Sequence, residues 1–429
     1  MDQSSGQIRF TRQQWGILFV LAAIQFTHIL DFVIVMPLGD HLRRQLSIDP
    51  QQFGMIVSAY GIAAMVTGIL SSSIIDSFDR KQVLVVSFGG FVIATFSCGL
   101  APGYVHLLAA RSFTGLFGGL AASSVMAIVG DVFADRQRGK AIGVVTSSFA
   151  VASIVGLPIG LGLAIWFKQW NAPFIGIGIL AVFVWFVAWV FLPSLTTHRT
   201  EVRHPPIVQF AKVVKEPNHG WAFAMMLATV LGTFTIVPYI APYLQANCGR
   251  SAEDLPIIYS MAGAFTLISL NLIGWGTDRF GAKPLFMFCA AGAVVMTLTI
   301  THLPPVSLWG AGAVTSLFMV LASGRSVPAQ AMMLQSSNPK LRGAFMNLNT
   351  AVTHFGTAIG PAITGAIVGE TSPGGPLTHF GTAGIIASFC GCVAIAISLR
   401  LKRYSEPLDI SVQSASMVDE QAAESNASR

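Results

Sequence analysis

The sequence predicts an all-α integral membrane protein with twelve transmembrane helices, arranged as two pseudo-symmetric six-helix bundles with both termini in the cytoplasm. Three observations predict this class. Hydrophobic residues fill 53% of the 429 positions, only 10% are Asp, Glu, Lys or Arg, and the mean hydropathy is +0.66. A soluble domain carries roughly 25% charged residues. The uncharged positions also form long runs, and the second half of the chain repeats landmarks of the first. The composition argues against a soluble enzyme, a disordered chain and a nucleic-acid binder.

The spans follow from the long runs without charged residues, because a membrane helix needs about 20 apolar residues. The run 284–324 is too long for one helix and is divided at His302, Pro304 and Pro305. Asp31 alone interrupts the stretch 13–39, and Arg325 lies inside the tenth span. The twelve predicted helices are 15–38, 52–75, 82–101, 105–130, 141–166, 172–193, 220–244, 256–276, 284–303, 306–333, 343–369 and 380–401.

The positive charges predict the orientation. Of the 25 Lys and Arg residues, 19 lie on the side of the N-terminus and two lie within spans. The other side has four, namely Arg43, Arg44, Lys168 and Arg250. Because cytoplasmic loops are enriched in Lys and Arg, we expect both termini inside and a multi-pass protein of a bacterial cytoplasmic (inner) membrane.

Four landmarks of the first half recur 201 to 204 residues later. They are Pro37 and Pro238, Asp76 and Asp278, Arg138 and Arg342, and Pro158 and Pro361. The repeat predicts a cytoplasmic N-terminal segment (1–14), a first bundle (15–193), a central cytoplasmic loop (194–219), a second bundle (220–401) and a disordered cytoplasmic tail (402–429). Two six-helix halves with a binding site between them, near the middle of the membrane, are typical of secondary transporters.

Short motifs mark the loops and helices of both halves. After the second helix stand Asp76 and the basic pair Arg80-Lys81. The matching segment after the eighth helix has Gly274, Asp278, Arg279, Gly281 and Lys283. The fourth helix contains Arg111-Ser-Phe-Thr-Gly115, and the fifth contains Gly156-Leu-Pro158-Ile-Gly160.

These motifs resemble the major facilitator superfamily over nearly the whole chain. Within it, the chain is most similar to the bacterial drug:proton antiporters of the twelve-span type. The resemblance implies the major facilitator fold and proton-coupled exchange of small molecules. It also places Arg111 in the cavity, near the proton site.

Asp31 is the candidate proton carrier, because it is the only carboxylate well inside a predicted span. A charged Asp at mid-helix costs roughly 2.5–3.5 kcal/mol on insertion scales, so we expect Asp31 to face a cavity and to bind a proton or a cationic substrate. His28, on the same helix face, is expected to share or tune that proton. The alternatives are a structural ion pair or hydrogen bond for Asp31, a hydrogen-bonded histidine at position 28, and an internal helix clamp for Arg111.

A second set of residues is expected to line a substrate cavity with few charges, suited to a moderately hydrophobic compound. It comprises Gln25, Phe234, Tyr239, Tyr259, Arg325 and Phe355. Arg325 cannot lose its proton, so it either binds an anionic group of the substrate or pairs only with backbone carbonyls. The alternative for the aromatic residues is contact with lipid.

Charged residues at the cytoplasmic helix ends predict a conformational latch. In the outward-open state Asp131 is expected to pair with Arg80 between the bundles, beside Asp76, and Asp278 with Arg279 is expected to act similarly in the second half. The alternative is simple surface charge.

Gly and Pro residues in helices 5 and 11 are expected to bend these helices and let them slide. They are Gly156, Pro158, Gly160, Gly360 and Pro361. The small-xxx-small spacing of such glycines also suits plain close packing.

The sequence shows no nucleotide-binding motif, no metal-ligand pattern and no catalytic constellation. The segment Arg138-Gly139-Lys140-Ala141 lacks the upstream Gly and the Ser or Thr of a P-loop. We therefore expect no enzyme activity and no cofactor. The expected partners are the lipid bilayer, protons and a small-molecule substrate, with no nucleic acid, and the protein is expected to be a monomer.

The favoured function is proton-coupled export of small, fairly hydrophobic compounds. An uptake carrier for a sugar or an organic acid is one rival, kept open by Gln25, Arg325, Gln330, Asn347 and Asn349. A membrane receptor that does not transport is the other.

Overall fold

The computed structural model describes residues 10–195, 206–372 and 374–404. Apart from one short hairpin, these residues form helices and their connections. The segments 1–9, 196–205 and 405–429 lie outside the described residues, so they include most of the predicted N-terminal segment, part of the central loop and nearly all of the tail.

The first half contains eight α-helices and one π-helical turn among the described residues. They are α1 (Arg12–Ile34), α2 (Gly39–Leu46), α3 (Pro50–Ser77), α4 (Arg80–Gly99), α5 (Tyr104–Val132), α6 (Asp135–Val151), the π-helix η1 (Ala152–Gly156), α7 (Leu157–Phe167) and α8 (Ala172–Phe191).

The second half begins with a short helix of the central loop and ends in a long one. Its helices are α9 (Pro206–Lys215), α10 (Pro217–Phe234), α11 (Val237–Ala246), α12 (Leu255–Phe280), α13 (Ala282–Thr301), α14 (Leu308–Gly324), α15 (Ser326–Ser336), α16 (Arg342–Ile367) and α17 (Phe380–Arg400). Two 3₁₀ turns, Ala252–Asp254 and Pro339–Leu341, precede α12 and α16. The strands β1 (Gly369–Glu370) and β2 (Leu377–Thr378) pair antiparallel between α16 and α17.

Eleven helical segments of the described chain are long and apolar enough to cross a membrane. They coincide with eleven of the twelve predicted spans. The remaining prediction, 343–369, coincides with α16, which has 26 residues but is not among the eleven. The physical reason is composition, since α16 contains Asn347, Asn349, Thr350, Thr353 and His354. The number of twelve membrane-spanning helices therefore remains a prediction.

Several helix ends follow from local sequence. Thr11 and Gln14 form a capping box at α1, and Asp49 and Gln52 form another at α3. The first span was predicted to run to residue 38, but α1 ends at Ile34 and a turn leads into α2. Pro37 explains the end, because a proline cannot donate the next helical hydrogen bond.

Asp79 caps α4 and ties it to the segment that follows α8. Its carboxylate accepts hydrogen bonds from the Lys81 N–H (2.8 Å), the Leu195 N–H (3.1 Å) and the Ser194 hydroxyl. Burial acts to raise the pKa of Asp79, but these hydrogen bonds outweigh it and hold the pKa below its usual range.

Replacing Asp79 with alanine is expected to lower the free energy of unfolding by about 1 kcal/mol at pH 7. A depressed folded-state pKa stabilises the protein above the unfolded-state pKa, and this stabilisation is lost as the pH falls through the folded-state value. The difference in Tm between wild type and Asp79→Ala should therefore shrink on acidification. Glu216→Ala is the matched control, because Glu216 stands at the N-cap of α10 without a side-chain capping bond. An equal loss in both variants would contradict the capping role of Asp79.

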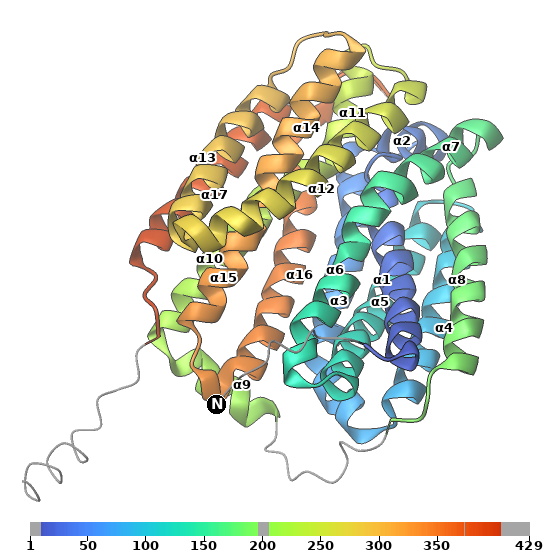
Figure 1. Cartoon of the computed structure of the whole chain (residues 1–429). Helices are drawn as coiled ribbons and strands as arrows, with labels where there is room; N and C mark the ends of the chain where they lie inside the picture. The colour runs from blue at the N-terminus through green and yellow to red at the C-terminus, as the bar shows by residue number, and fades with distance from the viewer. Residues whose placement is uncertain (1–9, 196–205, 373, 405–429) are drawn as a thin grey trace, which may run out of the picture.

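The two halves lie side by side and approach each other at the end where α2, α7 and α11 are labelled (Figure 1). We call this the closed end. The ribbons diverge toward the opposite end, where α9 is labelled (Figure 1). Across the closed-end region α3 packs on α16, with Gly61 against Ala358, and α12 packs on η1 and α7, with Gly263 against Ile154.

Candidate functional site

Asp31 and Arg111 form an ion pair buried within the first half. The Asp31 side chain comes from α1 and that of Arg111 from α5, and neither is exposed. Arg111 Nη1 lies 2.6 Å from Asp31 Oδ2 and 3.2 Å from the Asp31 carbonyl oxygen. Thr95 of α4 donates to Asp31 Oδ1 at 3.4 Å. The sequence predicted a carboxylate facing a cavity, but the structure encloses Asp31 against Arg111, because pairing offsets the cost of burying either charge.

Tyr60 of α3 covers the other face of this pair. The Arg111 guanidinium carbon lies 4.8 Å from the centre of the Tyr60 ring, a cation–π distance. The Tyr60 ring also packs on Phe32, with 4.9 Å between ring centres. The Tyr60 hydroxyl is buried and has no hydrogen-bond partner among the described residues. Sequence reasoning missed Tyr60, although it is the only tyrosine well inside a span of the first half.

His28 and Gln25 lie near the pair on α1. His28 is 7% exposed, and neither of its ring nitrogens has a hydrogen-bond partner within the described chain. Its ring lies 6.1 Å from that of Tyr60. The Gln25 side-chain oxygen is likewise buried without a partner among described residues. The structure thus gathers Asp31, Arg111 and unsatisfied polar groups of α1 and α3 in one region.

Arg325 occupies the break between α14 and α15 and is only 4% exposed. Its Nη2 donates to the Thr229 carbonyl oxygen at 2.9 Å and to the Thr233 hydroxyl at 2.6 Å, both on α10. Arg325 Nε has no partner among the described residues. In this state the cation is held by uncharged oxygens.

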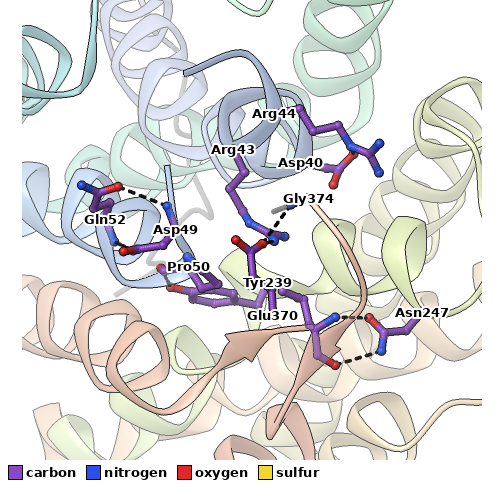
Figure 2. Close-up of polar contacts among 11 residues, drawn as sticks. Asp40, Arg43, Arg44, Asp49, Pro50, Gln52, Tyr239, Asn247, Glu370 and Gly374 are labelled. Carbon is purple, nitrogen blue, oxygen red and sulfur yellow. Dashed lines mark hydrogen bonds and ion pairs between the residues drawn. The ribbon is translucent and has the colours of Figure 1, made fainter. Parts of the chain in front are cut away.

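Tyr239 lies at the closed end and not in an open cavity. Its side chain is fully buried, and its hydroxyl donates to the Pro50 carbonyl oxygen at 2.7 Å. This bond joins α11 of the second half to the start of α3 of the first half (Figure 2). The aromatic ring was predicted to face substrate, but the rings of Phe53 and Phe380 pack against it instead.

A second bond between the halves at the closed end is an ion pair that sequence reasoning missed. Arg43 of α2 pairs with Glu370 of β1, and the Arg43 side chain is fully buried (Figure 2). Glu370 also accepts from the Gly374 N–H at 3.1 Å. Arg44 pairs instead with Asp40 of its own helix at 2.8 Å. The hairpin itself is tied to Asn247, which exchanges two hydrogen bonds with Leu377.

The other predicted cavity residues do not gather at one point. Phe234 lies at the end of α10, and its ring centre is 5.9 Å from that of Phe32 in the other half. Tyr259 of α12 is 5% exposed, and its hydroxyl has no partner among the residues described. Phe355 of α16 is 40% exposed. Phe234 thus contacts the other half beside Asp31, through the neighbouring residue Phe32.

The predicted latch differs from what the structure contains. Arg80 Nε lies 2.6 Å from Asp131 Oδ2, so this pair forms, but it joins α4 to α5 within the first half and does not join the two bundles. α4 begins at Arg80 and α5 ends one residue after Asp131, so the two side chains meet where these neighbouring helices begin and end. The side chain of Asp76 lies outside the described residues. Asp278 is exposed, and Arg279 stacks on Trp275 of its own helix at 5.2 Å.

The glycine and proline residues that were expected to bend two helices lie in η1, α7 and α16, at a π-helical turn and at tight contacts. The π-helical turn η1 ends at Gly156, directly before α7 with Pro158. A Cβ on Gly156 would meet Leu30 at 2.8 Å, and one on Gly160 would meet Ile34 at 2.6 Å. In α16, which contains Pro361, a Cβ on Gly360 would lie 2.7 Å from the backbone of Phe234 and Thr235. Larger residues there would push these helices apart.

Comparisons with known proteins agree with this architecture. A family profile described as "Major Facilitator Superfamily" matches residues 21–337. The chain belongs to the major facilitator superfamily. It is a membrane transporter of that superfamily, a family that does not consist of enzymes.

Relatives within the superfamily are distant but span most of the chain. An uncharacterized MFS-type transporter of Bacillus subtilis, YbcL, is 22% identical over 89% of this chain and 95% of its own length. Multidrug resistance protein 2 of the same organism is 22% identical over 83% of this chain and 89% of its own. The hexuronate transporter of that organism is 24% identical over 93% of this chain and 96% of its own.

A solved superfamily structure shows the same fold. A bacterial homolog of the human lysosomal transporter Spinster, in an inward-facing and unoccupied conformation, aligns with a TM-score of 0.72. It is 15% identical and covers 93% of this chain and 100% of its own. At that identity the likeness concerns the fold alone.

Proposed function

We propose that this superfamily member is a secondary active transporter that exports small, moderately hydrophobic compounds in exchange for protons by alternating access. The observation that carries the proposal is the Asp31–Arg111 pair, the one buried carboxylate–arginine pair among the described transmembrane residues. In our proposal the termini are cytoplasmic in a bacterial inner membrane, so the closed end faces outward.

The coupling step is proton exchange at Asp31. Arg111 keeps its proton throughout, so only Asp31 can change the charge of the pair. When Asp31 takes up a proton, the ion pair becomes a neutral acid beside a free guanidinium. The neutral acid no longer holds α1 to α5 by charge, and the freed donors of Arg111 and the unpaired groups of His28, Gln25 and Tyr60 need new partners. A proton on Asp31 can therefore shift the equilibrium between conformations in which these groups have different partners.

Two observations support export over import. The π-helical turn that ends at Gly156, directly before Pro158, falls in the segment that resembles the helix 5 motif of antiporters. A relative that covers most of the chain is named as a multidrug resistance protein. The rival, proton-coupled uptake of a sugar or an organic acid, draws support from the relative named as a hexuronate transporter.

The test is proton movement in everted membrane vesicles that carry wild-type protein or Asp31→Asn. A pH-sensitive dye reports on a panel of lipophilic cations, neutral antibiotics, sugars and organic acids. We expect at least one compound to release protons with wild type and the signal to fall at least about tenfold with Asp31→Asn, because only Asp31 of the pair can titrate. Asp254→Asn is the matched control, since Asp254 lies in the 3₁₀ turn before α12, in the other half of the protein, and pairs with Arg250.

Equal proton release from wild type and Asp31→Asn would contradict proton coupling at Asp31. The uptake alternative would be favoured by two results together: no compound of the panel releases protons in vesicles, and a sugar or organic acid accumulates in whole cells in a proton-dependent way.

A further inference from the structure

Arg325 is a buried cation in a half that lacks a buried acid. Between residues 255 and 369 the only acidic residue is Asp278, which is exposed in the last turn of α12. Residues 217–252 and 371–405 contain no Asp or Glu at all. The transmembrane part of the second half therefore supplies no carboxylate to balance Arg325.

The corresponding helices of the first half show what is missing. There Arg111 of α5 meets Asp31 of α1. Arg325 likewise extends from the α14–α15 helix to α10, but the repeat places Gly232 where the first half has Asp31. The neighbouring Thr233 offers Arg325 only a hydroxyl. The offsets of the landmarks on either side, 202 and 204, place Arg111 opposite residues 313–315, so Arg325 lies farther along its helix. The second half therefore keeps a buried cation but lacks the acid.

The hydrogen bonding of Arg325 is also incomplete. A guanidinium has five N–H donors. One nitrogen, Nη2, makes both the bond to the Thr229 carbonyl oxygen and the bond to the Thr233 hydroxyl, and Nε has no partner among the described residues. Burying a charge is costly unless it is paired and hydrogen-bonded. A carboxylate would supply both the missing charge and two acceptors in a bidentate arrangement.

We propose that the transported compound carries a carboxylate and that this group binds Arg325 beside Thr233. The inference deepens the proposed function and rests on it: the substrate is an amphipathic organic anion whose carboxylate is held by Arg325.

The sharpest test restores the acid within the protein. In Thr233→Asp a carboxylate replaces the hydroxyl that lies 2.6 Å from Arg325 Nη2, so it should occupy the place of the substrate carboxylate. Thr233→Asn is the matched control, with nearly the same shape and no charge. Gly232 is unsuitable for this purpose, because a Cβ there would meet the Ala387 carbonyl oxygen at 2.9 Å.

The measurement is thermal unfolding of the purified full chain with three carboxylates and their uncharged amides at equal concentrations: benzoate and benzamide, phenylacetate and phenylacetamide, octanoate and octanamide. We expect at least one carboxylate to raise the Tm of wild type and Thr233→Asn in a concentration-dependent way, as binding to the folded state requires, while its amide does not. Thr233→Asp should have a higher Tm without ligand and bind the carboxylate about tenfold or more weakly.

Two further variants separate the possible failures. Arg325→Gln should lose the preference for carboxylate over amide, whereas Asp31→Asn should keep it even if proton exchange is lost. No preference for any carboxylate in wild type, or an equal preference in wild type and Thr233→Asp, would overturn the inference and leave the proton test of Asp31 unaffected.

Discussion

Replacing Arg111 with methionine is expected to lower the free energy of unfolding by about 3–5 kcal/mol, because it leaves the Asp31 carboxylate buried without its counter-ion. Neither side chain of the pair is exposed, so water cannot substitute for the lost partner. Asp31→Asn should also destabilise the protein, since it leaves Arg111 charged and poorly satisfied. Thermal unfolding of the detergent-solubilised variants measures both losses.

The double variant Asp31→Asn/Arg111→Met distinguishes a structural pair from a coupling pair. Removing both charges should recover most of the lost stability, because a matched apolar or neutral pair costs little in such a site. Proton-coupled exchange should stay absent, since no titratable group remains at the pair. A double variant that regains stability and still couples protons to transport would place coupling elsewhere and leave the pair a purely structural clamp.

The charged residues inside the spans were the part of the site that could best be predicted from the sequence. Asp31 and Arg111 stand out in runs that otherwise lack charge, and a buried acid and a buried arginine each require a partner. The sequence left open a structural ion pair for Asp31 and an internal helix clamp for Arg111, but it did not pair the two residues with each other. Sequence alone gave no reason to prefer this pair over a cavity, because the distance between α1 and α5 depends on how the bundle packs.

The bonds of the closed end lay beyond sequence reasoning for a different reason. Arg43 and Glu370 stand in segments that connect spans, where a charge is usually solvated, and 327 residues separate them. Their burial arises only when the two halves meet. Tyr239 likewise depends on a backbone oxygen 189 residues away. Helices are predicted by local periodicity, but contacts between the halves are properties of one conformational state.

Breaking the Arg43–Glu370 pair is expected to shift the protein toward states that open at the closed end. A hydrogen bond between charged groups contributes roughly 1.5–3 kcal/mol, so its loss changes the ratio of closed to open states by about 10- to 100-fold. Glu370→Gln keeps the shape of the side chain and removes its charge. Arg43→Met keeps the apolar stem and removes the guanidinium.

Spin labels measure this shift directly. Lys168, after α7, and Glu253, before α12, are both exposed and belong to opposite halves near the closed end. The labels are placed in a protein without native cysteines. Their distance distribution should be longer and broader in Glu370→Gln and Arg43→Met than in the labelled protein that keeps both Arg43 and Glu370. Arg44→Met is the matched control, because Arg44 pairs with Asp40 within α2 and not across the halves.

The comparison among these variants also tests what holds the halves together. If Arg44→Met lengthens the distance as much as Arg43→Met, net charge on α2 and not the cross-half pair controls closure. If neither does, the Tyr239–Pro50 hydrogen bond and the packing of α3 on α16 suffice to keep this end shut. A shift confined to the Arg43 and Glu370 variants would mean that closure depends on the one ion pair between these two side chains. Because the Arg43–Glu370 and Asp31–Arg111 pairs share no residue, combining Glu370→Gln with Asp31→Asn should then give additive effects on opening and on proton exchange.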